Sequence, residues 1–215
     1  MTMTIFQEIA QFALVPVITI DRAEDALPLA DALSEGGLPL AEITLRTPAG
    51  LQAIALLAKH RPQILLGAGT VLTEDQVDQS LAAGARFALA PGLDAKVLAH
   101  AKAKGLPFAP GIMTPSDLQA ALRFGSELVK FFPAMPAGGP NMLKNIASPY
   151  AHTGIGFNPT GGVSLENLEE WLAIPQVRAL GGTWIAKRED IAAGHWDKIT
   201  ANAKAALAKV KSARP

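Results

Sequence analysis

One lysine of this chain stands in an environment where a charged amine is unexpected. Lys130 lies in the short apolar run 128–133, whereas lysines such as Lys59 lie in helical stretches with solvated faces. Alternate residues of a strand share a face, so Lys130 is predicted to point inward with Leu128 and Phe132. Desolvation favours the neutral amine, which can attack a carbonyl and form a Schiff base. The alternative is a structural lysine that reaches the rim or forms an ion pair.

A second polar set lies earlier in the chain, in the run 41–47. Alternation places Glu42, Thr44 and Arg46 on one face and two aliphatic residues on the other. The polar face is predicted to point inward, with Arg46 nearest the end of the strand. A buried carboxylate and guanidinium cost free energy unless they are paired or used in chemistry. The structural alternative is an ion pair of Glu42, with either Arg46 or Lys130, that closes the interior.

The elements that must position these residues alternate along the whole chain. Short β-favouring runs are followed by Ala- and Leu-rich stretches at helical spacing, which implies a parallel sheet with right-handed crossovers. Eight such units predict an α/β fold, a single-domain (β/α)8 TIM barrel over residues 1–215 with an extra N-terminal helix at 4–12. The competing fold is an open doubly wound sheet, but no GxGxxG follows the first strand. Strands are predicted at 14–20, 40–45, 64–66, 87–90, 108–110, 128–132, 155–158 and 177–180. Helices are predicted to begin near Arg22, Pro48, Glu74, Asp94, Pro115, Asn141, Leu165 and His195.

Small and polar residues cluster at the predicted strand ends, which form the working end of a barrel. Each cluster alone is consistent with a tight turn, but their joint placement favours a binding surface. The last two strands end in Gly-Gly pairs, where backbone N–H groups can approach a phosphate closely. These two ends therefore predict a phosphorylated ligand. The strand-end residues are Thr70, Pro91, Thr160, Gly161, Gly162, Gly181, Gly182 and Thr183.

Composition argues against several classes of function. Hydrophobic residues make up 49% and charged residues 18%, which is too apolar for intrinsic disorder. The 19 basic and 19 acidic side chains cancel, so neither nucleic acid nor a membrane is expected as a partner. With no cysteine there are no disulfides or thiolate ligands, and the four histidines lack metal-ligand spacing. We therefore expect no metal, and, with neither a secretory signal nor a membrane-spanning run recognisable, a cytoplasmic protein.

Six motifs in order along the chain resemble one family, the 2-keto-3-deoxy-6-phosphogluconate (KDPG) aldolases, which also includes 4-hydroxy-2-oxoglutarate aldolases. The resemblance covers essentially the whole chain, and the strand around Lys130 is its most specific part. It implies a class I aldolase on a (β/α)8 barrel, usually a homotrimer, that needs no metal or other cofactor. The motifs are EITLRT at 42–47, GAGTVL at 67–72, APG at 90–92, PG at 110–111, KFFPA at 130–134 and PTGG at 159–162.

The resemblance also assigns roles to residues. Lys130 is expected to form the Schiff base and Glu42 to act as the general acid–base, partly through a water. Two departures from the family pattern bear on the substrate: Thr183 stands where other members have Ser, and the loop 135–139 is particular to this chain. The remaining expected contacts are Arg46 and Thr70 to the substrate carboxylate, Pro91 and Phe132 as pocket walls, Thr160 to the substrate, and Gly161, Gly162, Gly182 and Thr183 to the phosphate.

The expected function is cleavage of the small-molecule 2-keto acid phosphate KDPG to pyruvate and glyceraldehyde 3-phosphate. Within the aldolases, the alternatives are 4-hydroxy-2-oxoglutarate and the galactonate-derived epimer of KDPG. More distant alternatives are a phosphosugar isomerase or epimerase without a Schiff base, and a non-catalytic protein that binds a phosphorylated ligand. An isomerase or epimerase would form no covalent adduct with pyruvate, and a binding protein would show no turnover.

Overall fold

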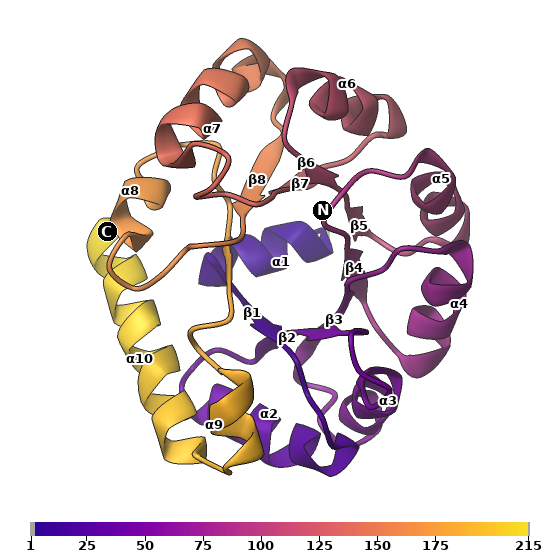
Figure 1. Cartoon of the computed structure of the whole chain (residues 1–215), viewed down its shortest axis with the longest axis vertical. Helices are drawn as coiled ribbons and strands as arrows, with labels where there is room; N and C mark the ends of the chain where they lie inside the picture. Colours follow the sequence, from indigo (N-terminus) through magenta and orange to yellow (C-terminus); the bar gives the residue numbers. More distant parts are fainter. Residues whose placement is uncertain (1–2, 215) are drawn as a thin grey trace.

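The computed structural model describes residues 3–214, in which parallel strands form a ring enclosed by helices (Figure 1). The predicted α/β barrel with its N-terminal helix is confirmed. The strands are β1 (Leu14–Ile18), β2 (Leu40–Thr44), β3 (Leu65–Gly69), β4 (Phe87–Leu89), β5 (Phe108–Ala109), β6 (Gly111–Ile112), β7 (Leu128–Phe131), β8 (Gly156–Pro159) and β9 (Leu180–Gly182). The α-helices are α1 (Ile5–Phe12), α2 (Ala26–Glu35), α3 (Gly50–His60), α4 (Glu74–Ala83), α5 (Ala95–Lys104), α6 (Pro115–Phe124), α7 (Gly139–Ala147), α8 (Leu168–Leu172), α9 (Arg188–Ala192) and α10 (Trp196–Ala213).

Two hydrogen-bonded sheets together make the ring. One has the strand order β5-β4-β3-β2-β1-β9 and the other β6-β7-β8. They separate at Pro110, which has no N–H for a sheet ladder, although its carbonyl accepts the Lys130 N–H at 2.8 Å. On the other side a parallel bridge between Thr160 and Gly181 joins β8 to β9. The ring is therefore closed, and the carboxyl ends of all its strands meet at one end.

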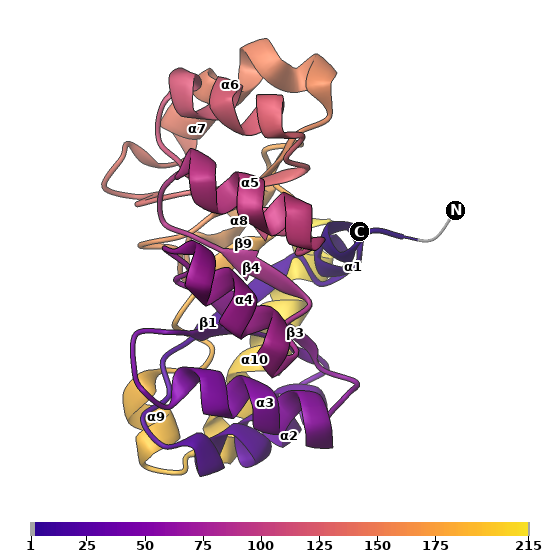
Figure 2. The same cartoon turned by 90° about the vertical axis from the view of Figure 1, so that its right-hand side faces the viewer.

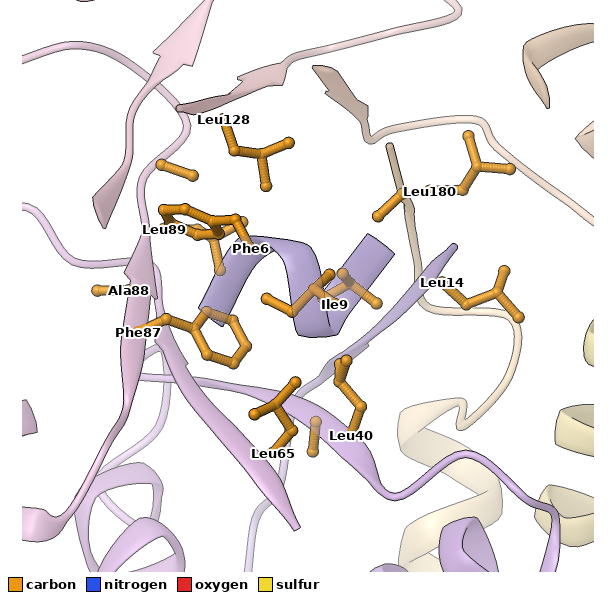
Figure 3. Packing of buried hydrophobic residues seen from close by; sticks show 14 of the residues in the cluster. Phe6, Ile9, Leu14, Leu40, Leu65, Phe87, Ala88, Leu89, Leu128 and Leu180 are labelled. Carbon is orange, nitrogen blue, oxygen red and sulfur yellow. The ribbon is translucent and has the colours of Figure 1, made fainter. Parts of the chain in front are cut away.

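The opposite end of the ring is filled by α1. The Thr4 side chain accepts the Gln7 N–H, and the Gln7 side chain accepts the Thr4 N–H, which fixes the start of this helix. Phe6 and Ile9 then lie among inward side chains from the first residues of the strands (Figure 3). In the side view α1 sits at one edge of the molecule (Figure 2). The neighbouring strand residues include Leu40, Leu65, Phe87 and Leu128.

Several predicted boundaries were wrong. The strand predicted at 108–110 is two short strands with Pro110 between them, and the one predicted at 177–180 begins at Leu180, with Val177 in an isolated bridge. The short helix α9 was not predicted. Predicted helix starts near Arg22 and Leu165 are displaced to Ala26 and Leu168, the first because a 3₁₀ turn at Ala23–Asp25 precedes α2. These errors fall where glycine, proline and short elements leave little hydrophobic periodicity.

Candidate active site

A buried ion pair occupies the interior of the barrel. Lys130 on β7 donates from Nζ to Oε1 of Glu42 on β2 at 3.0 Å. Their side chains are only 4% and 0% exposed. The two strands lie on opposite sides of the ring, so the lysine reaches across the interior (Figure 1). The predicted inward orientation of Lys130 is thus confirmed, and of the two structural alternatives the rim position is excluded whereas the pairing with Glu42 is present.

Gly69, the last residue of β3, makes room for the Glu42 carboxylate. A Cβ atom at this position would collide with Glu42 Oε1. Glu42 is in register with Gly67 and Thr44 with Gly69, so β3 presents no side chain of its own at these two positions beside the carboxylate. Sequence reasoning identified this segment as a small-residue strand end but not as the space for the carboxylate. The signal available in the sequence was a pair of glycines at alternate positions, Gly67 and Gly69, in the strand that follows the one with the inward-facing Glu42.

Burying the Lys130–Glu42 ion pair costs desolvation free energy that packing alone does not offset. Removing two charges from water is expensive, and replacing a buried ion pair with apolar side chains is often neutral or stabilising. Removing only one partner leaves a buried charge uncompensated and costs roughly 3–5 kcal/mol. Glu42 Oε2 is also buried and has no hydrogen-bond partner among residues 3–214. A carboxylate in this state retains a free oxygen with which to move protons near the amine.

A pocket of about 450 Å³ lies at the carboxyl ends of the strands, and Lys130 and Glu42 are enclosed below it rather than among its lining residues. All nine residues that sequence reasoning assigned to substrate binding line it. Val17 and Val163 also line it and were not predicted, and so does Gly181, which was predicted only as part of the Gly-Gly pair at the last strand end. The nine predicted lining residues are Arg46, Thr70, Pro91, Phe132, Thr160, Gly161, Gly162, Gly182 and Thr183.

The polar groups of the pocket separate into two parts. At one side, Arg46 lies just beyond the end of β2, and its Nε donates to Thr70 Oγ1 at 3.3 Å. At the other, Gly161 and Gly162 adopt positive φ values of 99° and 79°, which side chains rarely allow. A Cβ at Gly181 would collide with Thr160 Oγ1. The pocket therefore combines a cationic contact that follows β2 with a glycine-lined wall formed by the ends of β8 and β9.

The second buried polar residue beside the lysine was missed. Asn158 on β8 is in register with Lys130 on β7 and has no exposed surface. Sequence reasoning treated it only as the end of a strand. The signal was present, because Thr160 was expected to face the pocket and alternation puts the residue two positions earlier on the same face.

The residues that the structure describes contain no cluster of three His, Cys, Asp or Glu side chains arranged to hold a metal ion. In that same part of the chain, no helix has the length and apolar character needed to cross a membrane.

Comparisons with known proteins agree with this geometry. A family model described as KDPG and KHG aldolase matches residues 5–202. The chain is 45% identical to the 2-dehydro-3-deoxy-phosphogluconate aldolase of Treponema pallidum (strain Nichols) over 198 residues, which cover 92% of this chain and 93% of that protein. It also resembles the structure of KDPG aldolase from Legionella pneumophila with pyruvate captured at low pH as a covalent carbinolamine intermediate. That match has a TM-score of 0.90 and 41% identity and covers 94% of this chain and 98% of that one.

A further similar structure is the 2-keto-3-deoxy-6-phosphogluconate aldolase of Zymomonas mobilis ZM4 with 3-phosphoglycerate. It has a TM-score of 0.85 and 38% identity and covers 94% of this chain and 95% of that one. The barrel, the enclosed lysine and these likenesses define a class I aldolase, a carbon–carbon lyase that works through a Schiff base. More particularly, the chain belongs to the KDPG and KHG aldolase family. The predicted family and enzyme class are confirmed, against the isomerase and the non-catalytic binding protein.

Proposed function

We propose that this enzyme cleaves KDPG to pyruvate and glyceraldehyde 3-phosphate, with Lys130 as the Schiff-base lysine and Glu42 as the general acid–base. The observation that carries the proposal is the enclosed Lys130–Glu42 pair, 3.0 Å apart, beside a pocket lined by every expected binding residue. Relatives that bind pyruvate covalently or hold a three-carbon phosphate support both halves of this substrate.

The reaction begins with transfer of a proton from Lys130 Nζ to Glu42, which frees the amine. Nζ attacks C2 of the 2-keto acid, and the carbinolamine loses water to form an iminium ion, with Glu42 supplying the proton to the departing oxygen. Glu42, again a carboxylate, then takes the C4 hydroxyl proton, the C3–C4 bond breaks, and its electron pair moves into the iminium to give an enamine. Glyceraldehyde 3-phosphate leaves, C3 is protonated, and water releases pyruvate and the free lysine.

The two sides of the pocket are proposed to hold the two charged ends of the substrate. The carboxylate of the pyruvate half binds Arg46 and Thr70, since a guanidinium and a hydroxyl both donate to carboxylate oxygens. Pro91 and Phe132 wall the pocket, and Thr160 contacts the substrate between its ends. The phosphate binds at the glycine-lined wall through backbone N–H groups and one hydroxyl, contributed by Gly161, Gly162, Gly182 and Thr183.

Borohydride reduction in the presence of pyruvate tests the proposal. The expected result is a stable pyruvate adduct on Lys130, located by peptide mass spectrometry, and no adduct on other lysines. A folded enzyme that yields no adduct, or yields one elsewhere, contradicts the assignment of Lys130. Adding glyceraldehyde 3-phosphate before the borohydride is expected to lower the yield of the pyruvate adduct, because the enamine reacts with its aldehyde partner.

The family name includes a second activity, on 4-hydroxy-2-oxoglutarate, which we propose as the minor one. This substrate lacks a phosphate and gives the glycine-lined wall nothing to bind. We therefore expect a higher kcat/KM for KDPG than for 4-hydroxy-2-oxoglutarate or for the galactonate-derived epimer. Equal values for KDPG and the unphosphorylated substrate would contradict the proposed phosphate contacts.

We also propose that residues 1–215 act as one domain, in the cytoplasm, and that three copies assemble into a homotrimer. Exposed apolar side chains support assembly, since Leu72 is 55% and Met113 is 45% exposed beyond the carboxyl ends of β3 and β6. Burial between subunits would remove such side chains from water. Light scattering after gel filtration is expected to give three times the chain mass of 22.5 kDa.

A further inference from the structure

The reaction scheme leaves one enclosed carboxamide without a role. Asn158 is fully buried, and neither its Nδ2 nor its Oδ1 has a hydrogen-bond partner within residues 3–214. Such an unpaired polar group in an interior costs roughly 1–3 kcal/mol. An aliphatic side chain of similar size would avoid that cost. Packing therefore does not explain an asparagine at this position.

The strand geometry places Asn158 inside the barrel with Lys130. The two residues are Cα partners in the β7–β8 ladder, and partners in a parallel sheet project to the same face. Thr160, two positions after Asn158 and just beyond the end of β8, follows the same alternation and lines the pocket. Thr160 Oγ1 donates to the main-chain carbonyl of Asn158 at 3.4 Å, so this hydrogen bond does not involve the Asn158 side chain.

The unpartnered atoms near Lys130 complement one another. Glu42 accepts from Lys130 through Oε1, whereas its Oε2 has no donor in the described part of the chain. An ammonium carries three N–H donors, and a carboxamide offers both a donor group and an acceptor. The Nδ2–H of Asn158 is thus a donor of the kind that Glu42 Oε2 lacks, and its Oδ1 is an acceptor for a remaining N–H of Lys130, although no direct hydrogen bond joins these atoms in the structure.

We propose that Asn158 is a positioning residue for the Lys130–Glu42 pair, a proposal that rests on the catalytic roles proposed above. From the proton transfer that frees Nζ until the iminium ion forms, Lys130 carries no positive charge to orient Glu42. The uncharged Nδ2–H of Asn158 is not consumed in any step, so it keeps the carboxylate oriented, directly or through one enclosed water, while protons move to and from the carbinolamine.

The test is Asn158→Leu, which removes the donor and the acceptor but retains the volume. We expect kcat for KDPG cleavage to fall about tenfold, a modest loss for displacement of a catalytic group, with KM changed less than twofold. The rate of borohydride trapping with pyruvate should fall in parallel. The melting temperature should stay level or rise, because an unpaired buried polar group has been removed.

A matched control is Asn202→Leu. The Asn202 side chain donates to the carbonyls of Trp184 and Ile185, at 3.4 and 3.1 Å, so its loss should lower the melting temperature and leave kcat unchanged.

Asn158→Ala serves if the leucine variant does not fold. Wild-type kcat in a folded Asn158 variant, or a loss that appears only with lost stability, overturns the proposal. An adduct on Lys130 of the wild type, together with normal Asn158 variants, would reject this inference and leave the proposed reaction standing.

Discussion

The two ends of the barrel interior share strands but have opposite chemistry. On β2 the inward residue Leu40 packs near α1, and two positions later Glu42 enters the ion pair. On β7, Leu128 and Lys130 repeat this order. The amino-terminal end is thus apolar and closed by a helix, whereas the carboxyl-terminal end holds charges and an open pocket. One strand can therefore stabilise the fold with its first inward residue and serve catalysis with its second.

The largest expected effect is at the carboxyl-terminal end. Lys130→Ala should abolish turnover, because no other group can form the Schiff base. It should also destabilise the fold, since Glu42 is left as an unpaired buried carboxylate. Steady-state cleavage of KDPG and thermal unfolding measure the two effects. The exposed-lysine variant Lys96→Ala should match the wild type in both, and measurable turnover by the Lys130 variant would break the assignment.

Glu42→Gln comes next. Losing the general acid–base should lower kcat roughly 10²–10⁴-fold, while slow trapping of pyruvate on Lys130 persists. Stopped-flow measurement of the first turnover gives the loss of kcat, and the same reaction with borohydride gives the rate of pyruvate trapping on Lys130. A glutamine variant with full activity would remove Glu42 from the reaction and reduce the ion pair to a structural one.

At the amino-terminal end the expected effect is on stability alone. Ile9 is 1% exposed, so Ile9→Ala should cost about 2–5 kcal/mol of unfolding free energy. At 25 °C the remaining folded enzyme should keep wild-type kcat. Urea denaturation and activity assays on the same samples measure both, with the exposed Gln11→Ala on the same helix as control. A matching loss of kcat would break the separation between the two ends.

The smallest effect concerns a region outside both ends, where Asp190 on α9 accepts from Lys198 at 2.8 Å and from His195 at 3.2 Å. The hydrogen bond from Lys198 and, less strongly, that from His195 hold the pKa of Asp190 below its usual value despite burial. The lowered pKa stabilises the fold above the unfolded-state pKa of about 3.9, and this contribution is lost as pH falls through the folded pKa.

Melting temperatures of the wild type and Asp190→Asn should therefore differ at pH 7 and converge as the pH falls below about 4. Cleavage of KDPG at pH 7 should be the same for both, since Asp190 lies outside the pocket. A difference in melting temperature that persists unchanged into acid would show that the carboxylate charge does not stabilise this corner of the fold.

Much of the site could be predicted because strand alternation and strand ends are local properties. The inward face of 41–47 placed Glu42, and the lone lysine among aromatic residues placed Lys130. That the two side chains meet depends on closure of a ring between residues 88 positions apart, which no local pattern encodes. The family resemblance supplied the roles of the pocket residues.

What sequence reasoning missed has definite physical causes. Asn158 has a short polar side chain of a type that is common in turns, and it lies at a predicted strand end. Its residue type therefore did not mark it as a buried residue. Pro110 interrupts a strand that was predicted as continuous, because only the sheet shows which N–H is needed there. The last strand, β9, is mostly glycine, so its hydrophobic pattern predicted a position three residues too early.

The break at Pro110 gives the reactive pair an unusual dependence on the whole chain. Glu42 belongs to the six-stranded sheet and Lys130 to the three-stranded one, and the lysine must cross the ring to reach its partner. The part of the chain before Pro110 contains Glu42 but not Lys130, and the part after Pro110 contains Lys130 but not Glu42. Cut at residue 110, the polypeptide would become a split enzyme, and restored cleavage of KDPG would report that its two pieces had reassembled.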